Sequence, residues 1–301
     1  MLSIDEKALY YNISRTRYSG SGLVIELGPW LGSGTFEICR GLTETGKPWL
    51  LTVMDRFTWN DFYTAHYKQD GLSAGDSFLP KFLEYLQPYQ GRLIPISGDL
   101  SDIRSLMPFQ SNIELLFVDA PKSWRMLWRV LDHVGPWLLP NAQLVFQDFF
   151  HITSRQLIWL LMSLPQIEIR TIVEKGTSAV FEAKGPIVDL EASAPQDFKK
   201  LTPTDFRRLW GRLQTELPPP RVAELAVGMA LDLMDRGAHQ DANDVLVEGV
   251  LQTPFEKTIV NEVRRLLRKA DKEKPKLEQI LDFLTERRPL EPAAGRAVDA
   301  G

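Results

Sequence analysis

The chain has 301 residues, of which 44% are hydrophobic and 25% are charged, and its formal net charge at pH 7 is −4. These values are ordinary for a soluble globular protein, and a slightly acidic balance provides no basic surface for nucleic acid. No apolar run reaches the roughly 20 residues that a membrane-spanning helix needs, and the first residues lack a signal-peptide pattern. The single cysteine, Cys39, excludes an intrachain disulfide and a cysteine-based zinc site. Composition therefore predicts a cytoplasmic protein that binds neither nucleic acid nor membranes.

Most of the chain alternates between strand and helix patterns. Residues 1–20 are polar and aromatic, and we expect them to form a helical segment beside the mouth of a ligand site. Residues 21–186 predict a mostly parallel sheet with helices on both faces. The first five strands are expected at Leu23–Leu27, Trp49–Met54, Arg92–Ile96, Ile113–Val118 and Gln143–Gln147. Two later runs, Ile167–Val173 and Ser178–Glu182, are expected to close a doubly wound, seven-stranded α/β sheet as an antiparallel pair.

The pattern changes near residue 185, where small residues and prolines indicate a linker. Residues 200–288 then contain several amphipathic segments; in the first of them, Phe206, Leu209, Trp210 and Leu213 recur at helical spacing. We interpret this part as a C-terminal helical appendage that packs on the sheet domain, on a second copy of the chain in a homodimer, or on a partner protein. Residues 289–301 are expected to be a disordered tail.

The first expected strand runs into a glycine-rich turn and then a helix. Glu26 lies inside this apolar run, where a charge is costly without a partner, so its carboxylate is expected to face a ligand beyond the strand end. Gly28, Gly32 and Gly34 allow the backbone to turn tightly and approach that ligand, and Thr35 is a candidate helix cap. This spacing differs from the Gly-x-Gly-x-x-Gly of dinucleotide-binding folds.

An acidic residue stands at or just after the end of each of the first five expected strands. These residues are Glu26, Asp55, Asp99, Asp119 and Asp148. Each of them alone is readily explained as a turn residue or a helix cap. Because ligands of open α/β sheets bind at the carboxyl ends of the strands, five acids in succession predict a ligand site along that edge.

The segment Glu26–Gly32 reads Glu-x-Gly-x-Trp-x-Gly, which resembles the first motif of the class I methyltransferases that use S-adenosyl-L-methionine (SAM). It is most similar to the macrocin-type sugar O-methyltransferases. Leu116–Ala120 and Gly135–Phe149 resemble two further motifs of that family. The resemblance covers roughly residues 20–185. It implies a Rossmann-like methyltransferase fold and methyl transfer from SAM to an oxygen of a sugar or another small hydroxylated acceptor.

The resemblance also implies cofactor contacts. Asp55 would bind the ribose hydroxyls, since each carboxylate oxygen can accept one O–H bond, and Asp99 would contact the adenine amino group. Glu26 would face the cationic amino end of SAM. The remaining cofactor-binding candidates are Gly28, Gly32, Ser33 and, as a cover for the adenine, Phe57.

In the macrocin-type family, three carboxylates hold a magnesium ion that orients the substrate. The matching residues here are Asp119, Gln147 and Asp148. Gln147 stands where the family has an acid, so the resemblance leaves the need for Mg²⁺ open. Asp119 and Asp148 are nevertheless the main catalytic candidates. His151 is either a general base toward the acceptor hydroxyl or an ordinary hydrogen-bonded residue.

Two other classes of function remain open from the sequence. One is a NAD-dependent oxidoreductase, which the glycine spacing and Glu26 disfavour and for which no Tyr-x-x-x-Lys pair is apparent. The other is a non-catalytic, Rossmann-like binding module that acts through its helical appendage. The amide at Gln147, in place of an acid, is the best argument for the binding module.

Overall fold

The computed structural model describes residues 2–67, 71–107, 111–150, 155–173, 176–268 and 272–290. The chain divides into two compact units, Met1–Gln196 and Asp197–Gly301. The division lies between the two parts that the sequence predicts, in the stretch expected to be a linker. Each unit is described by itself below.

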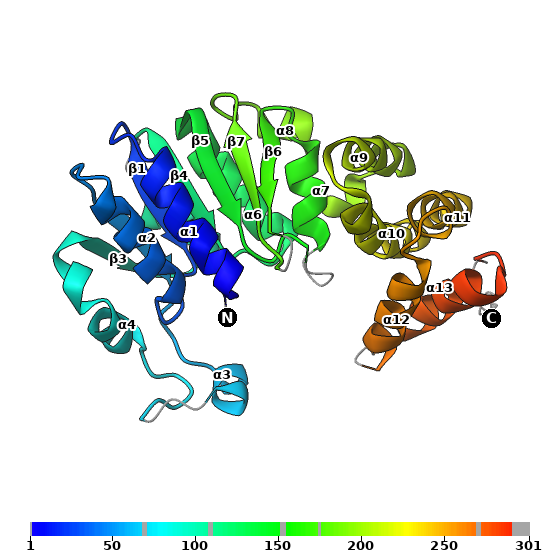
Figure 1. Ribbon diagram of the computed structural model, residues 1–301, viewed down its shortest axis with the longest axis horizontal. Helices are drawn as coiled ribbons and strands as arrows, with labels where there is room; N and C mark the ends of the chain where they lie inside the picture. Colours follow the sequence, from blue (N-terminus) through cyan, green and yellow to red (C-terminus); the bar gives the residue numbers. More distant parts are fainter. Residues whose placement is uncertain are drawn as a thin grey trace, which may run out of the picture. The chain divides into compact units, whose positions relative to one another are not determined.

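The first unit is built on a seven-stranded sheet of order β3-β2-β1-β4-β5-β7-β6 (Figure 1). The strands are β1 (Leu23–Leu27), β2 (Leu51–Asp55), β3 (Leu93–Ser97), β4 (Ile113–Val118), β5 (Leu138–Phe146), β6 (Ile167–Ile172) and β7 (Ala179–Ala183). Strands β1 to β5 pair in parallel, and β7 runs antiparallel to both β5 and β6. This is the strand order of the Rossmann-like methyltransferase fold, so the predicted fold class is confirmed.

Strand β5 begins five residues earlier than the sequence predicts. Pro140 and Asn141 lie before the expected strand, Gln143–Gln147, but in the structure they belong to it. The pairing register between β4 and β5 shifts there, and Asn141 adopts a positive φ of 69°. A bulge of this kind accommodates turn-forming residues without ending the strand.

Helices cover both faces of the sheet, as predicted. The helices of this unit are α1 (Ile4–Arg17), α2 (Ser33–Glu44), α3 (Asp61–His66), α4 (Leu79–Tyr85), α5 (Ile103–Leu106), α6 (Trp124–Val134), α7 (Arg155–Ser163) and α8 (Leu190–Ser193). Figure 1 shows α1 and α2 in front of the sheet and α6 behind it. The front layer matters for function because it lies over β1 and β4.

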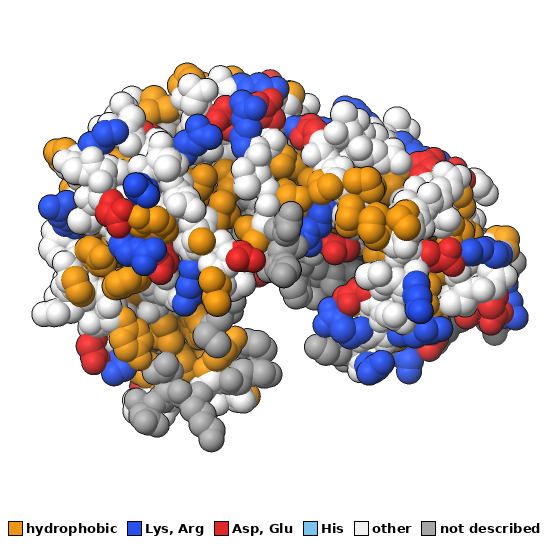
Figure 2. Space-filling view, viewed as in Figure 1, with side chains coloured by type: hydrophobic (Ala, Val, Ile, Leu, Met, Phe, Trp, Pro, Cys, Tyr) orange, Lys and Arg blue, Asp and Glu red, His pale blue; other side chains and the backbone are white. Residues whose placement is uncertain are grey.

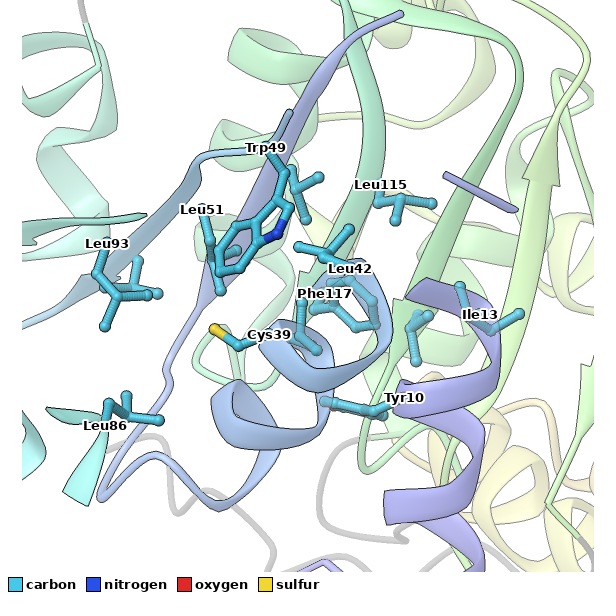
Figure 3. Close-up of a cluster of buried hydrophobic side chains, with 14 of the residues drawn as sticks. Tyr10, Ile13, Cys39, Leu42, Trp49, Leu51, Leu86, Leu93, Leu115 and Phe117 are labelled. Carbon is cyan, nitrogen blue, oxygen red and sulfur yellow. The ribbon is translucent and has the colours of Figure 1, made fainter. Parts of the chain in front are cut away.

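A large hydrophobic cluster fills the space between the sheet and its front layer (Figure 3). Tyr10 of α1 and Leu42 of α2 pack against Phe117 of β4, and the rings of Tyr10 and Phe117 have centroids 5.0 Å apart. Cys39 of α2 is fully buried in this cluster, and burial raises the pKa of its thiol. Cys39 is therefore a core residue and not an activated thiol.

Glu6 anchors helix α1 to the residues that precede β7. The carboxylate of Glu6 accepts hydrogen bonds from Ser3, which completes a capping box. It also accepts bonds from the backbone of Thr177 (3.1 Å) and the hydroxyl of Ser178 (2.7 Å), which lie just before β7. Burial works against the charge of Glu6, but these hydrogen bonds outweigh it and lower its pKa. The predicted helix at the N-terminus is thus present and tied firmly in place.

The second unit is helical, as the apolar spacing predicts. It contains α9 (Pro203–Glu216), α10 (Pro219–Met234), α11 (His239–Leu246), a π-helical turn (Val247–Leu251), α12 (Glu256–Leu267) and α13 (Lys274–Glu286). Thr202 caps α9 in a capping box with Asp205. The π-helical turn brings Gly249 against Trp210, where a Cβ atom would lie 2.7 Å from the indole ring. Within the described residues, we find no helix with the length and hydrophobicity needed to cross a membrane.

Candidate functional site

A cavity of about 680 Å³ lies at the carboxyl ends of β1 and β4. Its walls come from the glycine-rich loop after β1, from Lys7 and Tyr10 of α1, from Asp119 after β4 and from Gln147 after β5. Strand order reverses between β1 and β4, and open α/β sheets bind ligands at such a switch point. The cavity is therefore where the fold itself predicts a ligand.

The glycines of the loop are required by close packing. Gly28 has φ +87°, and a Cβ atom there would lie 2.6 Å from the backbone nitrogen of Ala120. Gly32 has the same φ and begins α2 as its N-cap. A Cβ atom at Gly34 would lie 3.0 Å from the ring of Tyr10. The loop thus passes directly over the end of β4 and under α1, and all three glycines line the cavity together with Ser33.

The sequence prediction for Thr35 was wrong. Helix α2 begins with Gly32, which provides no side-chain cap, so Thr35 lies inside the first turn of the helix. Its buried hydroxyl donates a 2.6 Å hydrogen bond to Oε2 of Glu26. The residue that was expected to cap the helix therefore orients the buried acid of β1.

Glu26 is 4% exposed and lines the cavity. Burial raises the pKa of Glu26 to about 8, in spite of the hydrogen bond from Thr35, and the nearby charges of Asp119 and Asp55 add to the increase. A carboxylate in this environment is stabilised by a cation or by a proton. Near neutral pH, Glu26 thus holds a proton that a cationic ligand would displace.

Asp55 lies at the end of β2, and its Oδ1 accepts a 3.0 Å hydrogen bond from the backbone of Phe57. Burial raises the pKa of Asp55, and backbone hydrogen bonds from Phe57, Trp30 and Arg56 oppose the increase. Through Trp30, the carboxylate also holds the glycine-rich loop. Asp55 itself is not among the residues that line the cavity. Its contact with the ribose stays a prediction.

Phe57 and Asp99 also lie away from the cavity lining. The ring of Phe57 is fully buried in the core, with centroids 5.5 Å from Phe78 and 5.4 Å from Phe82. Asp99 accepts hydrogen bonds from the guanidinium of Arg56 and, at 2.8 Å, from the backbone of Ser101. Hydrogen bonds from Ser101 and then Arg56 lower the pKa of Asp99. The adenine contacts expected for Phe57 and Asp99 stay predictions.

Asp119 and Asp148 lie on either side of a lysine that the sequence reading did not use as a charge partner. Nζ of Lys122 donates to Oδ1 of Asp119 and to Oδ2 of Asp148, both at 2.6 Å. Burial lowers the pKa of Lys122, but the two carboxylates outweigh this and raise it. Burial also raises the pKa of Asp119, against the opposing charge of Lys122. Asp148 has a left-handed backbone (φ 58°) and accepts a further bond from Thr177 (3.3 Å).

This arrangement does not fit the magnesium ligands that the resemblance implies. The ammonium of Lys122 lies where a cation bridging Asp119 and Asp148 would lie, and Gln147 offers only an uncharged amide. Across the described part of the chain, no three His, Cys, Asp or Glu side chains cluster as metal ligands. A hard divalent ion prefers several anionic oxygens, and here one oxygen of each carboxylate already binds the ammonium of Lys122. His151, the candidate base, lies outside the described residues.

An aromatic wall of the cavity contains residues that were not among the predicted site residues. Trp30 and Tyr67 both line it, with ring centroids 4.7 Å apart, and Tyr63 of α3 lies 5.8 Å from Trp30. Trp30 has φ 45°, and its indole nitrogen is buried without a hydrogen-bond partner among the described residues. Figure 2 shows hydrophobic side chains gathered on the surface that carries α3 and α4. Trp30 is part of the Glu-x-Gly-x-Trp-x-Gly motif, which was the available signal for this wall.

Comparisons with known proteins give distant likenesses. No family model matches the sequence, and no curated protein is similar enough to count as a match. Among solved structures, the chain is similar to the O-methyltransferase NovP (12% identity, TM-score 0.47, 60% of this chain and 80% of that one). It is also similar to an O-methyltransferase from Bacillus cereus in complex with SAH (12%, 0.44, 61% and 83%). A third is the O-methyltransferase TomG from Streptomyces achromogenes, in complex with SAM (15%, 0.44, 62% and 82%). The strand order of the sheet, and not these distant likenesses, identifies the fold as that of the class I methyltransferases.

Proposed function

We propose that the chain is a SAM-dependent methyltransferase that methylates an oxygen of a sugar or another small hydroxylated acceptor. The observation that carries the proposal is Glu26, a buried acid that lines the cavity at the switch point of the sheet. SAM presents two positive centres, an ammonium and a sulfonium. A cationic group beside Glu26 can take the place of the proton that this buried acid otherwise holds, which a neutral or anionic ligand cannot do.

The size and lining of the cavity support the same proposal. Its volume of about 680 Å³ lies within the range of small-molecule sites, roughly 300–1,000 Å³. Trp30, Tyr67, Phe36 and Tyr85 contribute aromatic rings to the lining. Such rings stack on flat heterocycles, and adenine is one. The cavity thus offers an acid for the amino end of SAM and aromatic surface for its base.

When bound, SAM supplies an electrophilic methyl group on its sulfonium. The protein then needs to align the acceptor oxygen and to exclude water. Asp119 and Gln147 line the cavity after β4 and β5, so we place the acceptor beside them. Asp119, held by Lys122, would accept a hydrogen bond from the acceptor hydroxyl and orient it. The sugar class of the acceptor follows from the sequence resemblance alone.

The test is a calorimetric titration of the full chain with SAM, S-adenosylhomocysteine and NAD. We expect the two adenosyl ligands to bind and NAD not to bind. Glu26→Gln should weaken SAM binding by about 10-fold to 100-fold, the equivalent of one strong charged hydrogen bond. The matched control is Glu114→Gln, which also removes a buried carboxylate. Glu114 binds the backbone of Ser19 and Ser21 instead, and it does not line the cavity.

Three results would count against the proposal. Binding of NAD alone would favour the oxidoreductase reading. Equal SAM affinity in Glu26→Gln and Glu114→Gln would remove Glu26 from the site. Binding of SAM without methyl transfer to any of a panel of sugars and small polyols would favour a binding module.

A further inference from the structure

The ammonium of Lys122 is held at a fixed place between two strand ends. It lies 2.6 Å from a carboxylate oxygen of Asp119, three residues earlier in the chain, and 2.6 Å from one of Asp148. Asp148 lies 26 residues from Lys122 in sequence, so the contact is tertiary. One side chain thus joins the carboxyl ends of β4 and β5.

The surrounding backbone fixes this position. Asp119 and Ala120 both donate to the carbonyl of Leu27, at 2.8 and 3.1 Å, which ties the turn after β4 to the end of β1. Ala120 also packs against Gly28, where no side chain would fit. On the other side, the hydroxyl of Thr177 holds Asp148. The lysine therefore bridges two acids whose positions are fixed by contacts near the ends of four strands, β1, β4, β5 and β7.

The charges make this a cation site that is already filled. Two carboxylates and one ammonium leave a single negative charge. A divalent ion bound to the same oxygens would have to lie beside the like-charged ammonium or displace it. Gln147, the third residue that the family resemblance offers, adds no charge to favour such an ion.

We propose that Lys122 takes the place of a divalent metal ion at this site, so that a side-chain ammonium is the resident cation between the ends of β4 and β5. The site then rejects Mg²⁺ and Mn²⁺ as long as residue 122 is positively charged. The consequence for catalysis rests on the proposed function: methyl transfer would proceed at the same rate in EDTA as in magnesium.

The experiment is a titration of the full chain with MnCl2 and MgCl2, without SAM, followed by calorimetry and by water proton relaxation for Mn²⁺. We expect no binding by the unaltered chain up to millimolar concentrations. Lys122→Arg, which keeps the charge, should behave in the same way. Lys122→Met and Lys122→Gln, which remove the ammonium from both carboxylates, should bind Mn²⁺ at least tenfold more tightly than the unaltered chain.

Two outcomes would overturn the proposal. The first is Mn²⁺ binding by the unaltered chain that Asp148→Asn removes, because the ammonium then does not exclude the metal. The second is the absence of binding in both neutral variants, because the two acids then form no cation site. Circular dichroism establishes that each variant is folded, and having two neutral variants guards against one that is not. Since no SAM is present, failure of the proposed function leaves this result unchanged.

Discussion

The acid near the end of β1 and the two acids after β4 and β5 differ in the charge of their hydrogen-bond partners. Glu26 is buried against the cavity and accepts a hydrogen bond from a neutral hydroxyl, that of Thr35. Asp119 and Asp148 share a lysine ammonium. Burial raises the pKa of Glu26 to about 8, whereas the two acids raise the pKa of Lys122 and keep it charged.

This difference shows which of the two acid sites would be stabilised by a bound cationic ligand. A buried acid with a neutral partner gains when a cation arrives, because the cation replaces the proton that the acid would otherwise hold. A pair of acids that already binds an ammonium gains little from a second cation. The end of β1 is therefore open to a cationic ligand, whereas the acids at the ends of β4 and β5 already bind a cation.

The largest expected effect on stability comes from a substitution in the glycine-rich loop that follows β1. Gly28→Ala combines a positive φ with a contact of 2.6 Å to the backbone of Ala120. We expect a loss of about 3 kcal/mol in the free energy of unfolding. Gly46→Ala is the control, because Gly46 also has positive φ (+69°) but has no neighbouring atom within 4 Å. It should cost only about 1 kcal/mol. Equal losses in urea unfolding would show that the close approach is unimportant.

A smaller effect follows from the pKa of Glu26. Between its usual pKa near 4.5 and about 8, the folded chain holds a proton that the unfolded chain has lost. The contribution of Glu26 to stability is therefore fully present below pH 4.5 and is lost as the pH rises toward 8. We expect Glu26→Gln to gain about 2 kcal/mol in the free energy of unfolding, relative to the unaltered chain, between pH 6 and pH 8. Urea unfolding at four pH values measures this, and parallel curves would contradict it.

Asp55→Ala tests the role of the acid at the end of β2, the strand beside β1. Its carboxylate binds the backbone of Phe57 and Trp30, so its removal loosens the glycine-rich loop, and the sequence predicts a ribose contact as well. We expect SAM affinity to fall about tenfold, equivalent to about 1.4 kcal/mol. Asp76→Ala is the control, since Asp76 accepts a similar backbone bond from Ser73 in an exposed segment. Unchanged affinity in Asp55→Ala would separate Asp55 from the cofactor.

The smallest effect is expected on the β4 and β5 side. Lys122→Met leaves two acids without their shared ammonium, but all three side chains are partly exposed, between 28% and 45%. Solvent screening should hold the loss of unfolding free energy at pH 7 to about 1 kcal/mol. Lys122→Arg should lose less than half of that. A loss in Lys122→Met as large as that of Gly28→Ala would mean that Lys122 is structural and not a resident ion.

The fold was predictable because its signals are local. Each strand is a short apolar run. In the helices of the second unit, apolar residues recur at helical spacing, as Phe206 and Trp210 do in α9. The bulge in β5 was missed because Pro140 and Asn141 have the composition of a turn.

The candidate site was predictable only in part, because its decisive contacts join distant residues. Of the five acids that the sequence places at strand ends, Glu26 and Asp119 line the cavity. Sequence spacing gave no sign that Arg56 binds Asp99, 43 residues away, or that Lys122 binds Asp148. Ion pairs between residues so far apart in the chain depend on tertiary packing, which a single sequence does not reveal.

The contacts of helix α1 with residues far along the chain affect the order in which the first unit can fold during synthesis. Glu6 binds Thr177 and Ser178, which follow it by 171 and 172 residues. Because α1 is synthesised before β7, its hydrogen bonds to Thr177 and Ser178 can form only after the start of β7 has been made. Lys7, which lines the cavity, directly follows Glu6 in α1 and is positioned together with it. A nascent chain should acquire its ligand-binding capacity only when nearly the whole first unit has been translated.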